Sequence, residues 1–325
     1  MKIVTPLNNE EWYEALIKAG ADEFYCGYQP PEWLKRYSNI YPINRREFLA
    51  NVNICDLNSM KILGKMVDKY KVPVKITFNS LYYLEEQYPI LADIIQRLKE
   101  FGFETFIIAD IGLILYLRKE KIDCKIHLSG ECGQMNHLGM KFLNQLGISR
   151  YIFTRKDSIE DIRNCIAKNP LKPEYEAFVL NEYCAFSGAY CNSLHNDWVP
   201  QMCRVKYKIR MIHDKSEKME RINQRAIELQ KELQSCGARK STPNSTFGKT
   251  GCGVCKVLEL KNAGVTHLKV VGRGKRKETL LDDMKQLREI INLTEQTMDT
   301  MEFEKSVKDT YFDGECRNYC YYSSR

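Results

Sequence analysis

The sequence predicts a (β/α)8 barrel of the TIM type. Short runs rich in β-branched and aromatic residues alternate with longer amphipathic helical stretches along most of the 325 residues. Strands that alternate with helices pair in parallel through right-handed crossovers, and eight such units close into a barrel. An open, doubly wound sheet is the alternative fold for the same pattern.

Eight segments are predicted as strands, and each is a short apolar run bounded by polar residues. They are Ile3–Thr5, Glu23–Gly27, Val74–Asn79, Thr105–Asp110, Cys124–Ser129, Arg150–Arg155, Glu176–Leu180 and His267–Gly272. The predicted helices between them include residues 8–20, 91–102, 140–147 and 158–169. Several of these helices end in Gly, which is the usual helix stop.

Two regions interrupt this alternation. Residues 181–203 are irregular and rich in cysteine, and residues 204–250 carry a long charged helix, about Asp214 to Ser235, followed by a polar linker. We therefore predict a barrel domain over residues 1–298, with this loop and this helical insertion between the seventh and eighth strands. The insertion is expected to lie over the active face.

Polar residues close several of the predicted strands. In both candidate folds the active site lies at the carboxyl ends of the strands. Four residues at such ends are the predicted catalytic residues, namely Asp110, His127, Arg155 and Arg273. A purely structural role is the alternative, because loops that follow strands are polar in any protein.

The net charge of +7 is concentrated in residues 204–250, which hold twelve Lys/Arg and five Asp/Glu. A second basic group contains Lys269, Arg273 and residues 275–277. A local positive excess suits an anionic small molecule or RNA as partner, and a solvated helix face is the alternative.

Thirteen cysteines occur in a chain that shows neither an export signal nor an apolar run of membrane-spanning length. This combination favours a cytoplasmic protein with reduced thiols and no membrane segment. Residues 299–325 are predicted as a C-terminal tail, in which Cys316 and Cys320 are expected to be a free or fraying pair.

The remaining cysteines include a constellation suited to metal chemistry. Cys184, Cys191 and Cys203 lie within one loop, and Cys252 and Cys255 form a C-x2-C pair before the eighth strand. Four thiolates brought together hold a [4Fe–4S] cluster, a [2Fe–2S] cluster or a zinc ion. The spacing alone leaves these alternatives open, together with unligated thiols.

The segment EAFVLNEYCAFSGAYC, from Glu176 to Cys191, resembles the signature of the U-32 peptidase family, E-x-F-x-x-G followed by a cysteine, a Ser-Gly and a second cysteine. The family's third cysteine precedes an arginine, as Cys203 does here, and its fourth precedes a run similar to the one that ends at Arg273. Counting back from Arg273 selects the first cysteine of the C-x2-C pair. The resemblance therefore implies a [4Fe–4S] cluster, with zinc as the alternative, on Cys184, Cys191, Cys203 and Cys252.

The resemblance extends upstream through AGADEFYCG, ADIGLI, IHLSGECGQMN and RYIFTRK, so it covers most of the chain. It departs from the family at the active face. Leu180-Asn181 replaces a His-Gly, Lys156 replaces a glutamate, and Val271 replaces a second glutamate. The missing histidine and carboxylates imply a divergent subfamily with a changed substrate.

The same resemblance implies an iron–sulfur enzyme that modifies RNA or a small aromatic substrate by oxygen-independent hydroxylation. The implied oxygen donor is an anion such as prephenate, and Arg155, Lys269 and Arg273 are chemically suited to hold a dicarboxylate. Two alternatives remain: a peptidase of the collagenase-like type, and an accessory iron–sulfur subunit that works with a protein partner.

Overall fold

Eight parallel strands close into a barrel in the computed structural model, which describes residues 1–38, 40–46, 52–133, 136–184, 188–191, 216–235, 246–296, 299–316 and 319–322. Neighbouring strands hydrogen bond in the order β1-β9-β8-β7-β6-β5-β4-β2, and the pairing of β1 with β2 completes the circle. The strands are β1 (Lys2–Pro6), β2 (Glu23–Tyr28), β4 (Val74–Phe78), β5 (Thr105–Ile108), β6 (Lys125–Leu128), β7 (Ile148–Ile152), β8 (Glu174–Leu180) and β9 (His267–Val270). All eight predicted strands are confirmed, with ends that shift by a few residues.

A further short strand lies outside the circle. The strand β3 (Asn53–Ile54) pairs in parallel with β2, where Gly27 faces Asn53. A two-residue strand has no measurable periodicity, so the sequence offered no basis for predicting it.

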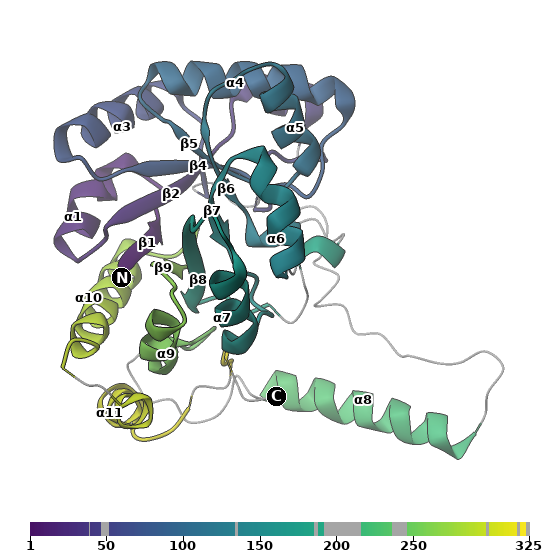
Figure 1. Cartoon of the computed structure of the whole chain (residues 1–325), viewed down its shortest axis with the longest axis vertical. Coiled ribbons are helices and arrows are strands. Elements are labelled where there is room, and N and C mark those ends of the chain that lie inside the picture. Colours follow the sequence, from purple (N-terminus) through teal and green to yellow (C-terminus); the bar gives the residue numbers. More distant parts are fainter. Residues whose placement is uncertain are drawn as a thin grey trace.

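Helices surround the barrel (Figure 1). They are α1 (Tyr13–Lys18), α2 (Pro31–Tyr37), α3 (Leu57–Tyr70), α4 (Tyr88–Glu100), α5 (Ile111–Lys119), α6 (His137–Leu143), α7 (Ile159–Lys168), α9 (Val257–Asn262), α10 (Lys277–Leu293) and α11 (Thr300–Phe312). The helix α8 (Glu217–Ser235) is inserted between β8 and β9 and lies apart from the barrel in Figure 1. Among the described residues, no helix combines the length and the apolar character needed to cross a membrane.

Side-chain caps fix where several helices begin. Asp56 accepts a hydrogen bond from the backbone of α3, Asp110 from that of α5 and Asn136 from that of α6. Ser158 and Asp161 form a reciprocal capping box at the start of α7. Such caps satisfy backbone N–H groups that a helix leaves unpaired at its first turn. Each cap therefore fixes the residue at which its helix begins.

Two apolar layers hold the barrel together. The larger one fills the space between the strands and the surrounding helices. A smaller one lies inside the barrel, because side chains alternate between the two faces of each strand. The inner layer consists of Val4, Tyr25, Ile107, Ile152, Phe178, Val271 and Tyr321.

The last of these residues comes from the C-terminal segment, in which the sequence predicted Cys316 and Cys320 to be free or fraying. Both cysteines are free of disulfide bonds, but the described part of the segment does not fray. Cys252 donates its backbone N–H to the carbonyl of Tyr319 at 2.9 Å and accepts from the N–H of Tyr321 at 2.9 Å, so this segment pairs with the chain that precedes β9. The preceding helix α11 buries Phe303 and Val307, which gives the segment a fixed starting point.

Candidate active site at the carboxyl ends of the strands

Arg155 follows β7 and lies at the mouth of the barrel. Its Nη1 donates to Oε1 of Glu131 at 2.9 Å, and its guanidinium lies 4.2 Å from the centre of the Phe178 ring. Burial lowers the pKa of Arg155, but the Glu131 carboxylate more than offsets this, so its pKa is raised and the group stays charged. Its Nε is buried and has no hydrogen-bond partner among the described residues. An unused donor on a buried cation is suited to an anionic ligand.

Arg273 follows β9 and faces β2 and β3. Its Nη1 donates to Oδ1 of Asn53 at 3.0 Å and to Oγ1 of Thr77 at 3.3 Å. A Cβ on Gly27 would overlap the Asn53 side chain and lie 2.8 Å from Nη1 of Arg273, so only glycine fits beside this pair. The close approach of β2 and β3 therefore fixes the guanidinium.

A third arginine links Arg273 to the cysteine-rich loop. Nη1 of Arg46 donates to the carbonyl of Arg273 at 2.8 Å and to Oε1 of Glu182 at 2.6 Å. The Tyr25 ring lies among these groups, because its hydroxyl interacts electrostatically with Arg273, Arg46 and Arg155. Burial raises the pKa of Tyr25, so its hydroxyl stays protonated. The mouth thus carries several cations around a neutral phenol.

The chain that leads to the first predicted ligand leaves β8 through a strained turn. Asn181 and Glu182 have φ angles of 68° and 49°, a left-handed conformation in which side chains other than glycine are uncommon. The Asn181 amide donates to the carbonyl of Val271 at 3.1 Å and to Asp283 at 2.8 Å, which stabilises the turn. Cys184 follows this turn, and its thiol interacts electrostatically with Arg155.

The other predicted ligands are placed to different degrees. Cys191 is half-buried and follows a 3₁₀ turn, Gly188–Tyr190, whose first residue lies against Glu131. Cys252 is buried and bridges to Leu180 at the end of β8. Cys203 lies outside the described residues.

Thiols are suitable ligands for a cluster, and two of the predicted ones, Cys184 after the turn that leaves β8 and Cys252 beside Leu180, lie near the same strand end. A shared metal site for the predicted ligands stays a prediction. Within the part of the chain that the structure describes, no three His, Cys, Asp or Glu side chains are arranged as a formed metal site. Cys255 is different, because its neighbours are Glu304 and Lys308 of α11 and the thiol of Cys316. Cys255 therefore faces α11, whereas Cys252 pairs with β8.

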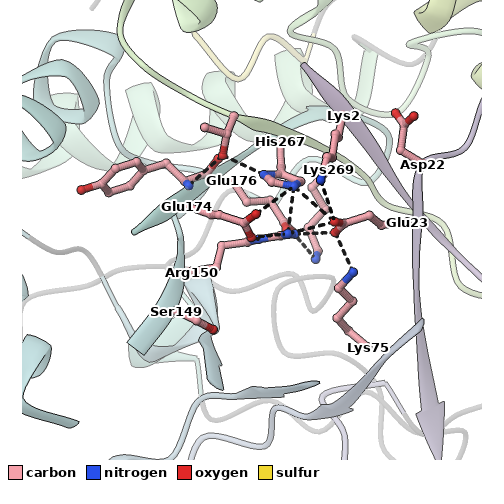
Figure 2. A network of polar contacts seen from close by, with 12 residues as sticks. Lys2, Asp22, Glu23, Lys75, Ser149, Arg150, Glu174, Glu176, His267 and Lys269 are labelled. Atoms are coloured by element: carbon pink, nitrogen blue, oxygen red, sulfur yellow. Dashed lines mark hydrogen bonds and ion pairs between the residues drawn. The ribbon is translucent and has the colours of Figure 1, made fainter. Parts of the chain in front are cut away.

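A buried charge network fills the interior on the amino-terminal side of this mouth (Figure 2). Arg150, only 1% exposed, donates to Glu23 at 2.8 Å, to Glu176 at 2.8 Å and to Glu174 at 2.6 Å. Lys75 pairs with Glu23 at 2.8 Å, and further contacts of the network include those of His267 and Lys269. The sequence analysis missed the network. The sequence did contain a signal for it, because the strands are apolar except for charged residues at alternate positions. In a barrel, alternate positions of a strand point inward.

Two predicted catalytic residues lie away from the mouth arginines. His127 is buried in the barrel beside this network, and burial, followed by Arg150 and Lys75, lowers its pKa, so the imidazole is neutral. Asp110 caps α5 by accepting from Gly112 at 2.8 Å, and it also accepts from the backbone of Tyr83 at 2.9 Å. A catalytic role for either residue stays a prediction.

The charge of the insertion is not carried by its helix. Residues 217–235 contain four Lys/Arg and four Asp/Glu. Arg221 lies 3.5 Å from Glu217, and Arg225 lies 3.5 Å from Glu228. The predicted long charged helix is confirmed as α8, and the positive excess of residues 204–250 falls on residues flanking it in the sequence.

Comparisons with known proteins show what the chain is similar to. The sequence profile of Peptidase family U32 matches residues 8–324. A protein of Escherichia coli (strain K12), named tRNA hydroxylation protein P, is 31% identical over 173 residues, which cover 52% of this chain and 34% of that protein. The match thus spans about a third of that relative's length. The tRNA hydroxylation protein P2 of Bacillus subtilis (strain 168) is 24% identical over 313 residues, 93% of this chain and 89% of that protein. Among solved structures, the U32 peptidase Mk0906 aligns with a TM-score of 0.45 at 9% identity, over 84% of this chain and 93% of that one.

Proposed function

The chain belongs to peptidase family U32, and from this premise we propose that it is an iron–sulfur enzyme that hydroxylates tRNA without molecular oxygen. The single observation that carries the proposal is the combination, at one end of the barrel, of a cationic site with an unused donor and the thiols of Cys184 and Cys252. The names of the two relatives, both tRNA hydroxylation proteins, supply the substrate class.

The cationic groups suit an anionic oxygen donor, for which prephenate is the candidate. Arg155 offers its unpaired Nε, and Arg273 offers a second guanidinium held by Asn53 and Thr77. Guanidinium groups bind carboxylates in two-pronged fashion and stay charged at every relevant pH. A dicarboxylate bound here would lie against the rings of Tyr25 and Phe178, which exclude water and strengthen the ion pairs.

Cys184, Cys191, Cys203 and Cys252 would hold the [4Fe–4S] cluster, which supplies one-electron chemistry when bound. The residues of the chain perform the remaining tasks. Arg155 interacts electrostatically with Cys184, so the cation lies close to one of the proposed ligands. Tyr25 donates its hydroxyl to the carbonyl of Val270 at 3.1 Å, which holds its neutral ring beside the arginines that would bind the anion.

The peptidase alternative needs an activated nucleophile or water. The described carboxylates of the mouth, Glu131 and Glu182, are each paired with an arginine, at 2.9 Å and 2.6 Å. A carboxylate that is paired with an arginine is a weak general base, so these two are better suited to position a ligand. The geometry therefore supports binding of an anion better than hydrolysis of a peptide.

The test is an anaerobic reaction of the purified protein with unmodified tRNA and prephenate, followed by digestion and mass spectrometry of the nucleosides. We expect a nucleoside heavier by one oxygen atom. Arg155→Ala should abolish the product, because the donor loses its charged partner, while Arg163→Ala, on the exposed surface of α7, should leave it unchanged. Cleavage of a denatured collagen substrate without tRNA modification would contradict the proposal.

A further inference from the structure

The C-terminal segment contributes an aromatic residue to the interior of the barrel. The Tyr321 ring is 7% exposed and belongs to the inner apolar layer, although it lies about fifty residues after the last strand. Its ring centre lies 6.2 Å from that of Phe178 at an interplanar angle of 30°, a stacked arrangement. Phe178 is the same residue whose other contacts include the guanidinium of Arg155.

The Tyr321 hydroxyl connects two parts of the candidate site. It donates to the carbonyl of Asn181, in the strained turn before Cys184. The side chain of Arg155 lies close enough to the same hydroxyl to interact with it electrostatically. One hydroxyl thus lies between the turn and the cation at the mouth.

The contacts of Arg155 then leave one direction open. Glu131 binds Nη1, Phe178 covers the face of the guanidinium, and the Tyr321 hydroxyl lies near the charged group. Nε is buried and has no partner among the described residues. Contacts that hold the rest of the guanidinium also fix the direction of Nε. A free arginine side chain samples many rotamers, and ordering it when a ligand binds would cost affinity.

We propose that Tyr321 is a positioning residue of the active site, which orients Arg155 toward an anionic group of the ligand. The C-terminal segment is then a part of the site rather than an appendage. The inference deepens the proposed function and rests on it for the identity of the ligand, but the orientation of Arg155 can be measured without any ligand.

The segment is anchored well enough to perform this role. Both neighbours of Cys320 pair with the backbone of Cys252 at 2.9 Å, and the Tyr322 hydroxyl donates to the carbonyl of Phe178 at 2.7 Å. A Cβ on Gly253 would lie 2.9 Å from the Tyr322 ring, so the two chains are in close contact. Tyr321 therefore has a fixed position relative to β8.

The first test measures the accessibility of Arg155 in the ligand-free protein. Phenylglyoxal modifies guanidinium groups, and mass spectrometry of peptides gives the rate at Arg155. Tyr321→Phe should raise this rate about tenfold, the factor that corresponds to one lost polar interaction of a charged group. The matched control is Tyr311→Phe, which removes a hydroxyl of α11 that donates to Glu289 at the surface and should leave the rate unchanged. Equal rates in the two variants would overturn the proposal.

The second test measures affinity for prephenate by anaerobic calorimetry in a double-mutant cycle. Tyr321→Phe should weaken binding about tenfold in the native background and have no effect when Arg155 is alanine, since the hydroxyl acts through that arginine. A merely structural role would weaken binding equally in both backgrounds, which would refute the proposal. If Arg155→Ala leaves prephenate binding unchanged, the proposed anion site is wrong, while the phenylglyoxal rates still decide the positioning role.

Discussion

Replacement of Arg150 by methionine tests the physical account of the barrel interior. Arg150 is buried and is shared by Glu23, Glu174 and Glu176, with five hydrogen bonds to these carboxylates between 2.6 and 3.2 Å. Methionine fills a similar volume but leaves Glu23 and Glu176 buried with less positive charge. Breaking a buried pair by removing one partner costs about 3–5 kcal/mol.

The expected result is a large loss of stability that depends on pH. In a chain of this size such a loss lowers the melting temperature by roughly 5–15 °C at pH 7. In the native protein burial raises the pKa of Glu23, but hydrogen bonds from His267 and Arg150 and the charge of Lys75 more than offset this, so its pKa is lowered. Its stabilising contribution is therefore present at neutral pH and is lost only as the pH falls below the range of an ordinary glutamate.

Without Arg150 the pKa values of both buried glutamates rise, because Glu23 keeps Lys75 and Glu176 keeps Lys269 but each loses the guanidinium. Uptake of a proton in mild acid then relieves the excess buried negative charge. The stability deficit of Arg150→Met should accordingly shrink as the pH is lowered from 7 to 5. The assay is thermal or urea unfolding at both pH values, with Arg163→Met as control. Arg163 also pairs with a glutamate, at 2.6 Å, but its side chain is 46% exposed. A deficit no larger than that of the control, or one that grows in acid, would refute the reasoning.

Three further outcomes follow from the site. Cys252→Ser should remove the visible absorbance of anaerobically purified protein, whereas Cys255→Ser should retain it, because Cys255 faces α11; equal loss in both would show that the ligand assignment is wrong. Arg273→Ala should abolish tRNA modification while the absorbance and melting temperature stay close to native values, and full activity would exclude an anion-binding role. A hydrogen bond from Cys320 lowers the pKa of the exposed Cys316 thiol to about 6, so at pH 7 it should react with iodoacetamide roughly tenfold faster than the exposed Cys55. The absolute rate at Cys316 should fall as the pH drops below about 6, because its thiolate is then protonated. Equal rates, measured by peptide mass spectrometry, would contradict this.

The barrel was predictable because its strands carry a strong local signal. A run such as Thr105–Ile108 is apolar on both faces, and the amphipathic helix that precedes it places its apolar side on the strands. The exact ends of the strands were less predictable, since they depend on pairing with neighbours rather than on local sequence.

The candidate site was predictable in part. The position of Arg155 follows from its place after a strand. Its ion-pair partner does not, because the sequence alone does not say whether Glu131 or Asp110 lies within reach of the guanidinium. Tyr321 could not be foreseen, because its contacts join segments that are far apart in the sequence and no periodic pattern marks them. The interior network was recoverable in principle, as Arg150 and Lys75 break the apolar character of their strands at inward-facing positions.

The content of iron and acid-labile sulfide in anaerobically purified protein tests the central claim most directly. The account predicts a brown protein with about four irons and four sulfides per chain, and their loss on replacement of Cys184 by serine. A colourless protein with one zinc ion per chain, or a protein with no bound metal that still modifies tRNA, would contradict it.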